Sequence, residues 1–223
     1  MVISLCAAGH LSATENNPNN DNKFMEENLN LIQEWDKTFP QSDKVNHKKI
    51  TFHNRYGITL TADLYVPKNA TGKLSAIAIS GPFGAVKEQA SGLYAQTLAE
   101  RGFLTIAFDP SYTGESGGQP RYVASPDINT EDFSAAVDYL STRDDVDAER
   151  IGILGICGWG GMALNAAAID TRIKATVTAT MYDMGRVNAN GYFDSMNADA
   201  RHELRRQLNA QRTEDYRNGT FAL

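Results

Sequence analysis

The sequence predicts an α/β fold, with a mostly parallel sheet, helices on both faces and an N-terminal β-hairpin at one edge. Two observations predict it. Apolar, β-branched runs alternate along the chain with segments of helical periodicity. The apolar runs are nearly continuous, which is typical of parallel strands that are buried on both faces. The 223 residues suit one domain with extensions, and a hydrophobic content of 42% is enough for a core.

Residues 1–23 form a predicted tail before the domain. The tail begins with the apolar, small-residue stretch MVISLCAAGHLSA and continues through the linker-like segment NNPNNDN. Ala13 is a plausible cleavage point of a secretory signal peptide, but no basic residue precedes Lys23. Two interpretations stay open: a clipped signal peptide of a periplasmic or secreted protein, or the plain tail of a cytoplasmic one.

The predicted domain spans residues 24–223. The segment FMEENLNLIQEWDK predicts a short amphipathic helix, and KKITFHN with GITLTADLYVP predicts the hairpin. Four buried strands are predicted at KLSAIAISGP, FLTIAFDP, RIGILGI and IKATVTATMY. Helices are predicted at KEQASGLYAQTLAERG, NTEDFSAAVDYLSTR and GGMALNAAAID. Gly102 signals the end of the first helix, and Asn129 or Thr130 is the expected N-cap of the second.

No strand pattern follows Tyr182. Residues 184–223 are predicted to form a helical, cap-like segment, whose polar helix MNADARHELRRQLNAQRTEDYRNG has few apolar positions. The strand IKATVTATMY would therefore have an exposed edge, and such an edge favours self-association.

Composition excludes several classes of function. The formal net charge is −6 and no basic stripe occurs, so nucleic acid is not an expected partner. No apolar run reaches the roughly 18–20 residues of a membrane span. The sequence contains no CxxC, no HExxH and no pair of histidines at ligand spacing, so no metal and no other cofactor is predicted.

The stretch GICGWGG lies between a predicted strand and a predicted helix and contains Cys157. A nucleophile on such a turn needs small flanking residues, because strand and helix crowd there. Gly155 and Gly158 fit this pattern, whereas Trp159 stands where a small residue is expected and is predicted to fill space at the turn. The alternative is that Cys157 is a small buried residue, as free cysteines often are.

Three segments together resemble the α/β-hydrolase superfamily, in particular its dienelactone-hydrolase-like branch: SGPFGAVKEQASGLYAQTLAERGF, FDPSYTGESGG and GICGWGGMALNAAA. The resemblance covers roughly residues 48–182, and the family's C-terminal part has no counterpart in the chain. It implies an α/β-hydrolase fold, incomplete at its C-terminus. A Cys in place of Ser at the turn is familiar in this branch, so the resemblance also implies that Cys157 is the nucleophile.

The resemblance extends to the residues around the nucleophile. In the superfamily, one oxyanion amide follows the nucleophile and the other comes from the loop after the third strand. These positions correspond to Gly158 and to the loop SGPFGA, where Phe83 is the expected donor and Gly84 the next choice, because Pro82 has no N–H. The expected pocket residues are Trp159, Gly84 and Tyr112.

The base and the acid are harder to find. The superfamily order is nucleophile, acid and then histidine. His202 is the only histidine after Cys157, and it lies in a polar helix. Asp183 follows the strand IKATVTATMY, where some relatives place their acid, although it could simply cap a loop. The remaining histidines precede Cys157: His10, His47 and His53.

Four further charged residues flank the predicted site. Lys87 and Glu88 could pair or contact substrate, but a solvated helix start is the favoured interpretation. Asp109 and Glu115 flank the loop DPSYTGES, where turn chemistry accounts for Asp109.

Two classes of function remain. The first is an enzyme that hydrolyses a small-molecule ester, thioester or lactone through Cys157, with weak or no turnover in this chain because the histidine is missing. The second is a non-catalytic pseudo-enzyme or binding module, or a shortened product without a function of its own.

Overall fold

A computed structural model describes residues 27–221, so the predicted tail at residues 1–23 lies outside the described part of the chain. The strands are β1 (Val45–His53), β2 (Thr59–Pro67), β3 (Leu74–Ser80), β4 (Leu104–Phe108), β5 (Val146–Ile156) and β6 (Ile173–Ala179). The helices are α1 (Ala90–Ala99), α2 (Pro126–Ser141), α3 (Trp159–Ile169), α4 (Met184–Asn190), α5 (Ala198–Asn218) and the 3-10 helix η1 (Tyr192–Asp194). None of the described helices combines the length and hydrophobicity needed to cross a bilayer.

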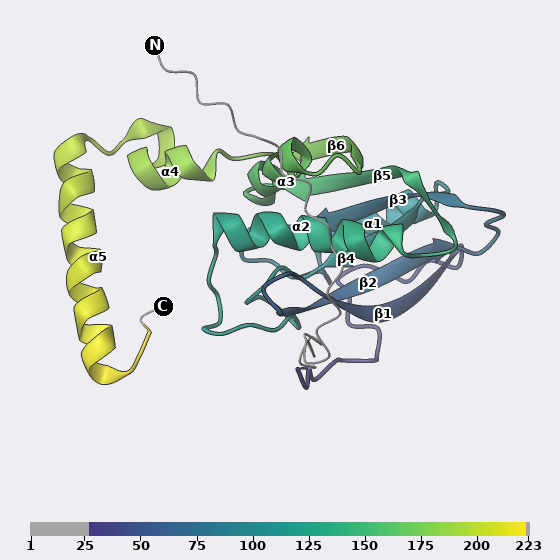
Figure 1. The fold of residues 1–223 in the computed structure, drawn as a ribbon, viewed down its shortest axis with the longest axis horizontal. Coiled ribbons are helices and arrows are strands. Elements are labelled where there is room, and N and C mark those ends of the chain that lie inside the picture. The colour runs from purple at the N-terminus through teal and green to yellow at the C-terminus, as the bar shows by residue number, and fades with distance from the viewer. Residues whose placement is uncertain (1–26, 222–223) are drawn as a thin grey trace, which may run out of the picture.

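The strands form one sheet in the order β1-β2-β4-β3-β5-β6 (Figure 1). The β1–β2 hairpin is antiparallel and joins β4 in antiparallel fashion, whereas β4, β3, β5 and β6 run parallel. The predicted fold class is therefore confirmed, with the hairpin at one edge. Parallel strands point their carboxyl ends the same way, so the loops after β3, β4, β5 and β6 gather at one end of the sheet.

Two clusters of buried side chains cover the two faces of the sheet. The larger cluster includes side chains of α2 and α3, such as Phe133 and Ala163, packed on the strands. The smaller one packs α1 through Ala95 and Ala99 against the other face. Helices thus cover both faces, as predicted, and α1 is the one helix on the second face among the described residues, where Trp35 also packs.

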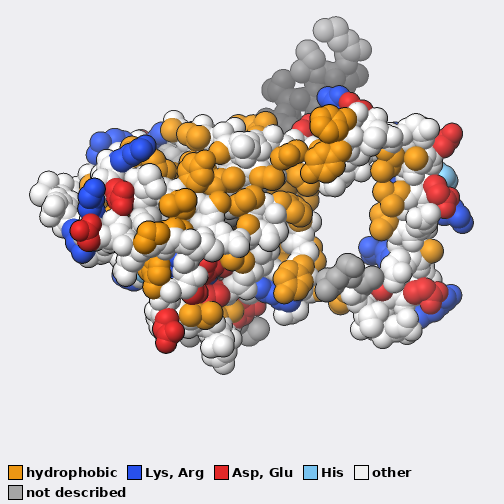
Figure 2. All heavy atoms as spheres, turned by 180° about the vertical axis from the view of Figure 1, so that it is seen from behind, with side chains coloured by type: hydrophobic (Ala, Val, Ile, Leu, Met, Phe, Trp, Pro, Cys, Tyr) orange, Lys and Arg blue, Asp and Glu red, His pale blue; other side chains and the backbone are white. Residues whose placement is uncertain are grey.

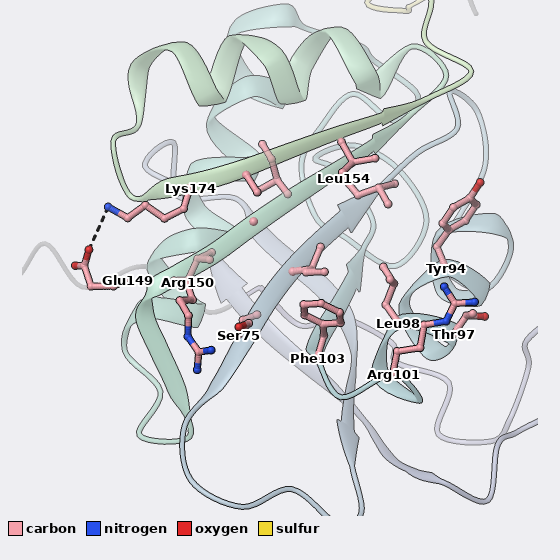
Figure 3. Close-up of a pocket in the computed structure, with 17 residues that line it drawn as sticks. Ser75, Tyr94, Thr97, Leu98, Arg101, Phe103, Glu149, Arg150, Leu154 and Lys174 are labelled. Atoms are coloured by element: carbon pink, nitrogen blue, oxygen red, sulfur yellow. Dashed lines mark ion pairs between the residues drawn. The ribbon is translucent and has the colours of Figure 1, made fainter.

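The sheet is less completely covered than its sequence suggests. The strand IKATVTATMY is predicted to be buried, yet no residue of β6 is fully buried and Val177 is 53% exposed. β6 is the last strand of the sheet among the described residues. On the α1 side, a groove of about 750 Å³ runs between α1 and β6, lined by apolar side chains such as Leu98, Phe103 and Leu154 (Figure 3).

The predicted helix at residues 24–37 is wrong for its described part, because residues 27–37 contain no helix. The segment follows the surface of the domain, and its N–H groups donate to other segments. The Ile32 N–H donates to Glu115 Oε1 at 2.7 Å, and the Thr38 N–H donates to the Glu88 carbonyl at 3.0 Å. Phe39 is buried beside Gly92 of α1, where a Cβ would lie 3.0 Å from the ring. Tertiary contacts therefore outweigh the helical periodicity.

Helix α2 begins earlier than predicted. Its N-cap is Ser125, whose side chain accepts from the Ile128 N–H, and Pro126 occupies the first helical position. The predicted N-caps lie inside the helix. The Asn129 side chain instead accepts from the Ser125 N–H at 2.8 Å. The N-cap residue and the first turn are therefore joined by side-chain hydrogen bonds in both directions.

The segment after β6 contains α4, η1 and α5. Asp183 caps α4, and Asn197 caps α5 by accepting from the Ala200 N–H. Helix α5 stands apart from the sheet and its covering helices, and a gap separates it from the body (Figures 1 and 2). The predicted polar helix is confirmed, and none of its described residues is buried.

Phe133 anchors α2 to the sheet and offers a test of the core. It is fully buried, and its ring meets that of Phe108 edge to face with centroids 5.2 Å apart. We expect Phe133→Ala to lower the free energy of unfolding by about 3–5 kcal/mol, because it leaves a cavity. Ile169→Ala, at a position 74% exposed on α3, should change it by less than about 0.5 kcal/mol. Urea denaturation of both variants measures the difference, and equal effects would contradict the packing described.

Candidate functional site

Cys157 occupies the turn between β5 and α3, so the predicted strand–turn–helix arrangement is confirmed. Its backbone φ is +57°, in the left-handed region that non-glycine residues rarely adopt. Three hydrogen bonds hold this conformation. The Cys157 N–H donates to the Ala179 carbonyl at 2.9 Å, and the Cys157 carbonyl accepts from the N–H groups of Gly160 and Tyr182 at 3.0 and 3.3 Å.

Glycines make the turn possible because strand and helix approach very closely. A Cβ on Gly155 would lie 2.3 Å from the Trp159 carbonyl oxygen. A Cβ on Gly81, in the loop after β3, would lie 2.4 Å from the Ile156 carbonyl oxygen and 2.9 Å from the Trp159 Cβ. At such a turn, a small residue two positions after the nucleophile usually leaves space. Here that position is Trp159, and Gly81 leaves the space instead.

Trp159 fills space beside the turn, as predicted. It is only 5% exposed, and its ring meets Phe83 edge to face with centroids 5.3 Å apart. Phe83 itself lies against the start of α3, since a Cβ on Gly158 would come within 3.2 Å of the Phe83 ring. The loop after β3 and the start of α3 therefore meet beside Cys157.

This contact brings together the two segments that carry the predicted oxyanion donors, the amides of Phe83 and Gly158. Gly158 is the residue immediately before α3, so its N–H belongs to the first turn of that helix. Neither amide donates a hydrogen bond to another group in the part of the chain that the structure describes. Cys157 is half-buried, and its thiol has no hydrogen-bond partner within residues 27–221.

Two cavities adjoin this contact. One of about 500 Å³ lies between α3 and α4 and includes Phe83, Gly158 and Asp183 in its wall. Its side chains are mainly apolar: Met162, Leu164, Met181, Tyr182 and Met184. A smaller cavity of about 240 Å³ lies on the other side of Phe83 and is bounded by Gly84 and Trp159.

Two further predicted site residues lie as follows. Tyr112 has a φ of +71° and packs against the larger core cluster, outside the walls of both cavities. Asp183 is exposed, and its carboxylate accepts from the Arg186 N–H at 2.9 Å, so it caps α4 at the rim of the larger cavity.

The described histidines lie away from Cys157. His47 and His53 are on β1, four strands from β5, which is about 19 Å at the usual spacing of strands. His47 Nε2 contacts Asp63 Oδ1 at 2.8 Å. His202 is exposed on α5, which stands apart from the sheet. Residues 27–221 thus bring no imidazole to the turn.

A buried charged network beside the site was missed by the sequence analysis. Lys87 is 1% exposed, so the prediction of a solvated helix start is wrong. Its ammonium lies 2.9 Å from Asp109 Oδ2, 2.6 Å from Glu115 Oε2 and 2.5 Å from Glu88 Oε1. Only the run of charged residues near the predicted oxyanion loop hinted at it.

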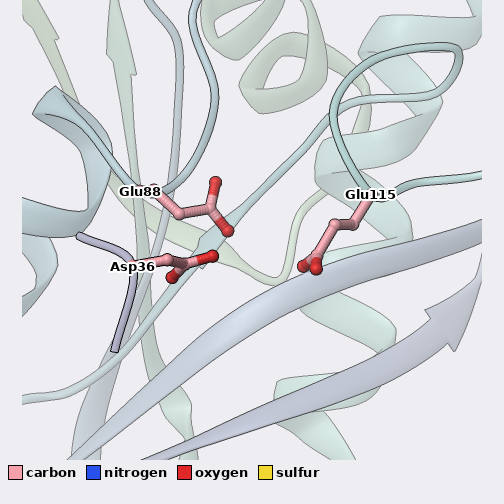
Figure 4. Close-up of side chains that lie close together, drawn as sticks. All are labelled: Asp36, Glu88 and Glu115. Atoms are coloured by element: carbon pink, nitrogen blue, oxygen red, sulfur yellow. The ribbon is translucent and has the colours of Figure 1, made fainter. Parts of the chain in front are cut away.

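Three carboxylates of this region face one another: Asp36, Glu88 and Glu115 (Figure 4). The Lys49 ammonium lies between them, 2.6 Å from Glu115 and 3.6 Å from both Asp36 and Glu88. The cluster is therefore neutralised by lysines of this chain, as expected for buried charges.

The network alters the pKa values of its members. Burial opposes ionisation of Glu115, but hydrogen bonds from Lys49 and Lys87 outweigh it and hold the pKa of Glu115 below its usual value. Burial also disfavours the Lys87 ammonium, but Asp109, Glu88 and Glu115 raise the pKa of Lys87 above its usual value. For Asp109, burial dominates over the nearby Lys87 and raises the pKa of the carboxyl to about 6.

Comparison with known proteins gives one family match and several relatives. Residues 56–220 match the family model of X-Pro dipeptidyl-peptidase (S15 family). An uncharacterized protein of Pseudomonas aeruginosa, PA2218, is 62% identical over all 223 residues, which correspond to 59% of its length. The Thiohydrolase aneE of Aspergillus aculeatus is 30% identical over 137 residues, covering 61% of this chain and 42% of the relative.

Solved structures show the same fold. The crystal structure of PA2218 matches with a TM-score of 0.87 and 68% identity, over 88% of this chain and 62% of that one. The α/β hydrolase GrgF from Penicillium sp. sh18 matches with a TM-score of 0.59 and 23% identity, over 76% of this chain and 55% of that one. The predicted α/β-hydrolase fold is confirmed, and the dienelactone-hydrolase-like branch is compatible with these neighbours. The chain spans about three-fifths of the length of PA2218.

The crowding at Gly155 yields a test of the turn. We expect Gly155→Ala to lower the free energy of unfolding by about 1–3 kcal/mol or more, because the added methyl meets backbone that cannot move aside. Gly161→Ala is the matched control in α3. The nearest atom to its added Cβ is 3.8 Å away, so helix propensity should raise stability by about 0.5–1 kcal/mol. Chemical denaturation distinguishes the two, and a neutral Gly155→Ala would show that the turn is less crowded than described.

Proposed function

The chain belongs to the X-Pro dipeptidyl-peptidase (S15) family, and on this premise we propose that it carries the nucleophile half of an acyl-transfer site. The proposed reaction is hydrolysis of a small-molecule ester, thioester or lactone, with Cys157 as nucleophile. The observation that carries the proposal is the strained φ of +57° at Cys157, on the turn between β5 and α3. Strain of this kind persists only where the surrounding structure enforces it, and it clusters at functional sites.

The amides of Phe83 and Gly158 are the proposed oxyanion donors. Both belong to segments that meet beside Cys157, and an amide at the start of a helix suits a developing negative charge. These features support attack of the Cys157 thiolate on a carbonyl carbon, with the oxyanion held by the two amides.

The larger cavity is the proposed acyl site. Its side chains are mainly apolar and include Met162, Met181 and Met184, which adapt to irregular ligands. An apolar acyl group on a thiol or alcohol is therefore the favoured substrate class, in line with the thiohydrolase among the relatives. Trp159 and Gly84 belong to the wall of the smaller cavity, which would take the leaving group. Residues 184–223 are proposed to act as a cap-like segment, since α4 forms one wall of the larger cavity.

The base is the part of the site that residues 27–221 do not bring to Cys157. Without an imidazole, no general base takes the proton of the attacking thiol, and water is not activated for deacylation. Asp183, at the rim of the cavity, is the proposed acid. We therefore propose that the chain as given acylates slowly and turns over weakly or not at all. The alternative, a non-catalytic binding module, would bind the same apolar acyl group without acylation.

A test uses p-nitrophenyl acetate with the 223-residue chain. We expect slow acylation of Cys157 and little turnover, because loss of a triad base leaves only about 10³–10⁴-fold acceleration over water. Cys157→Ala should abolish the acylation, and mass spectrometry of the intact chain should detect the acyl adduct only in the parent.

Two results would contradict this proposal. Absence of any adduct on Cys157 would favour the binding module. Multiple turnovers that vanish in Cys157→Ala would show that the chain contains a base, and His202 with Asp183 would be the first pair to test.

The exposed side of β6 leads to a proposal about assembly. We propose that the chain self-associates through β6. Its outer edge pairs with no other described strand and can pair with a second copy, and its apolar face is partly exposed. We expect sedimentation equilibrium to show a concentration-dependent mass above 24.4 kDa. Val177→Lys, which places a charge on this strand, should shift the equilibrium toward the monomer, whereas a monomeric parent at all concentrations would contradict the proposal.

A further inference from the structure

Lys87 is a buried ammonium whose hydrogen-bonding capacity is fully used. Its side chain is 0% exposed, and it meets the carboxylates of Asp109, Glu115 and Glu88 at 2.9, 2.6 and 2.5 Å. An ammonium has three N–H donors and no acceptor. Lys87 therefore has no donor left for a substrate and cannot act as a base, so any part it has in acyl transfer is indirect.

The Lys87–Asp109 pair joins two loops at the carboxyl end of the sheet. Asp109 follows β4, and besides the ammonium it accepts the Lys87 N–H at 2.7 Å and the Glu115 N–H at 2.9 Å. Gly114 allows this approach, since a Cβ there would lie 2.2 Å from the Asp109 carboxylate.

The Lys87–Asp109 pair also fixes the C-terminal end of the loop that carries Phe83. At the start of this loop, Ser80 Oγ donates to the Phe108 carbonyl at 3.0 Å. At its end, backbone and side chain of Lys87 are both fixed to Asp109, the next residue after Phe108. Residues 81–86 therefore form an arch. The residues at its two ends are bonded to Phe108 and Asp109, which are neighbours at the end of β4.

We propose that Lys87 and Asp109 are positioning residues for this arch, and that their ion pair holds the Phe83 amide where the oxyanion forms at Cys157. The inference rests on the proposed function, because it assumes acyl transfer to Cys157. Without the ion pair, the arch loses the side-chain link between its end and Asp109, and what remains includes its β3 end, its contacts with Trp159 and Gly158, and the bonds between Val86 and Gln89. A small displacement of an oxyanion donor is enough to reduce its contribution.

The step that depends on the arch is the acylation itself. The thiolate of Cys157 attacks the carbonyl carbon of the ester, an S–C bond forms, and the π-electron pair moves onto the oxygen. The intermediate then collapses, the C–O bond to the leaving group breaks, and p-nitrophenolate departs, leaving a thioester on Cys157. Alkylation by iodoacetamide uses the same thiolate but only displaces iodide, so it needs no oxyanion donor.

The experiment compares these two reactions in a Cys6→Ser background, which leaves Cys157 as the only cysteine. The measured quantity is the ratio of the acylation rate with p-nitrophenyl acetate to the alkylation rate with iodoacetamide. Accessibility and ionisation of the thiol affect both rates, so the ratio reports the oxyanion site.

We expect Lys87→Met and Asp109→Asn each to lower this ratio at least about tenfold, as partial loss of a donor worth about 10²–10³. The double variant removes both charges, so it leaves no lone charge in the core and should fold. Its ratio should fall to the level of the single variants and no further, because both residues act through one pair.

The chain offers a matched control in Lys37 and Asp63. Their charged atoms lie 3.1 Å apart, and both side chains are 0% exposed, as in the Lys87–Asp109 pair. Asp63 lies on β2, and among the described residues the ion-pair partners of the two are each other, Asp36 and His47, none of which belongs to residues 81–86. Lys37→Met combined with Asp63→Asn should leave the ratio within about twofold of the parent while removing the same kind of buried pair.

A pH profile adds a readout that a purely structural role would not move. The pKa of Asp109 is raised to about 6 by burial, so above this pH its carboxylate pairs with Lys87, and below it the pair is lost. The other charged groups of the network come from the surrounding segments: Lys87, Glu88, Glu115, Lys49 and Asp36. The ratio should fall as the pH drops through about 6 in the parent and stay flat in Asp109→Asn.

The outcomes separate the two proposals. If the parent is alkylated but never acylated, the proposed function fails and the inference falls with it. If the parent is acylated and the double variant, folded by circular dichroism, keeps the parental ratio, the positioning role is overturned while the nucleophile stands. An equal fall of the ratio in the Lys37–Asp63 control would also overturn the positioning role, because removal of any buried ion pair would then lower the ratio.

Discussion

The close approach of α3 to β5 is the constraint on which the rest of this site depends. Gly155 has no side chain, so the Trp159 carbonyl can approach to where a Cβ would stand. The chain must therefore reverse within Cys157 and Gly158, and Cys157 takes a left-handed conformation. Since Trp159 cannot enter the space between strand and helix, its side chain turns toward the loop after β3, where Gly81 gives it room. The position of Phe83 follows from this contact.

A second constraint comes from the charges buried beneath the same loops. Removing Lys87 and its carboxylates from water is costly, and their attraction offsets this cost only where the geometry is good. Ion pairs of this kind add little net stability, but they allow few alternative arrangements of the loops that carry them. The network ties the segment before α1, the loop after β4, strand β1 and the N-terminal segment to one another. Segments at the carboxyl end of the sheet are thus joined by ion pairs, whereas the body of the domain relies on apolar packing.

The two faces of the sheet differ in a way that bears on assembly. α2 and α3 together cover one face, while α1 covers the strands β2, β3 and β4 on the other and leaves an apolar groove over β5 and β6. The same strands carry the site, because Cys157 directly follows β5 and its N–H donates to the carbonyl of Ala179 at the end of β6. A second strand paired on β6 would stabilise the segment that fixes Cys157.

The sequence by itself determined the alternation of strands and helices, the hairpin at one edge and the turn at Cys157. These features depend on patterns within about a dozen neighbouring residues, and glycine, β-branched residues and periodicity encode them locally. The tertiary structure alone decided that Lys87 is buried, that residues 27–37 form no helix and that the described histidines lie far from the nucleophile. Each of these depends on groups far apart in the chain, such as Lys49 and Glu115, which are 66 positions apart. Burial and ion pairing depend on which segments meet, and local patterns carry no record of that.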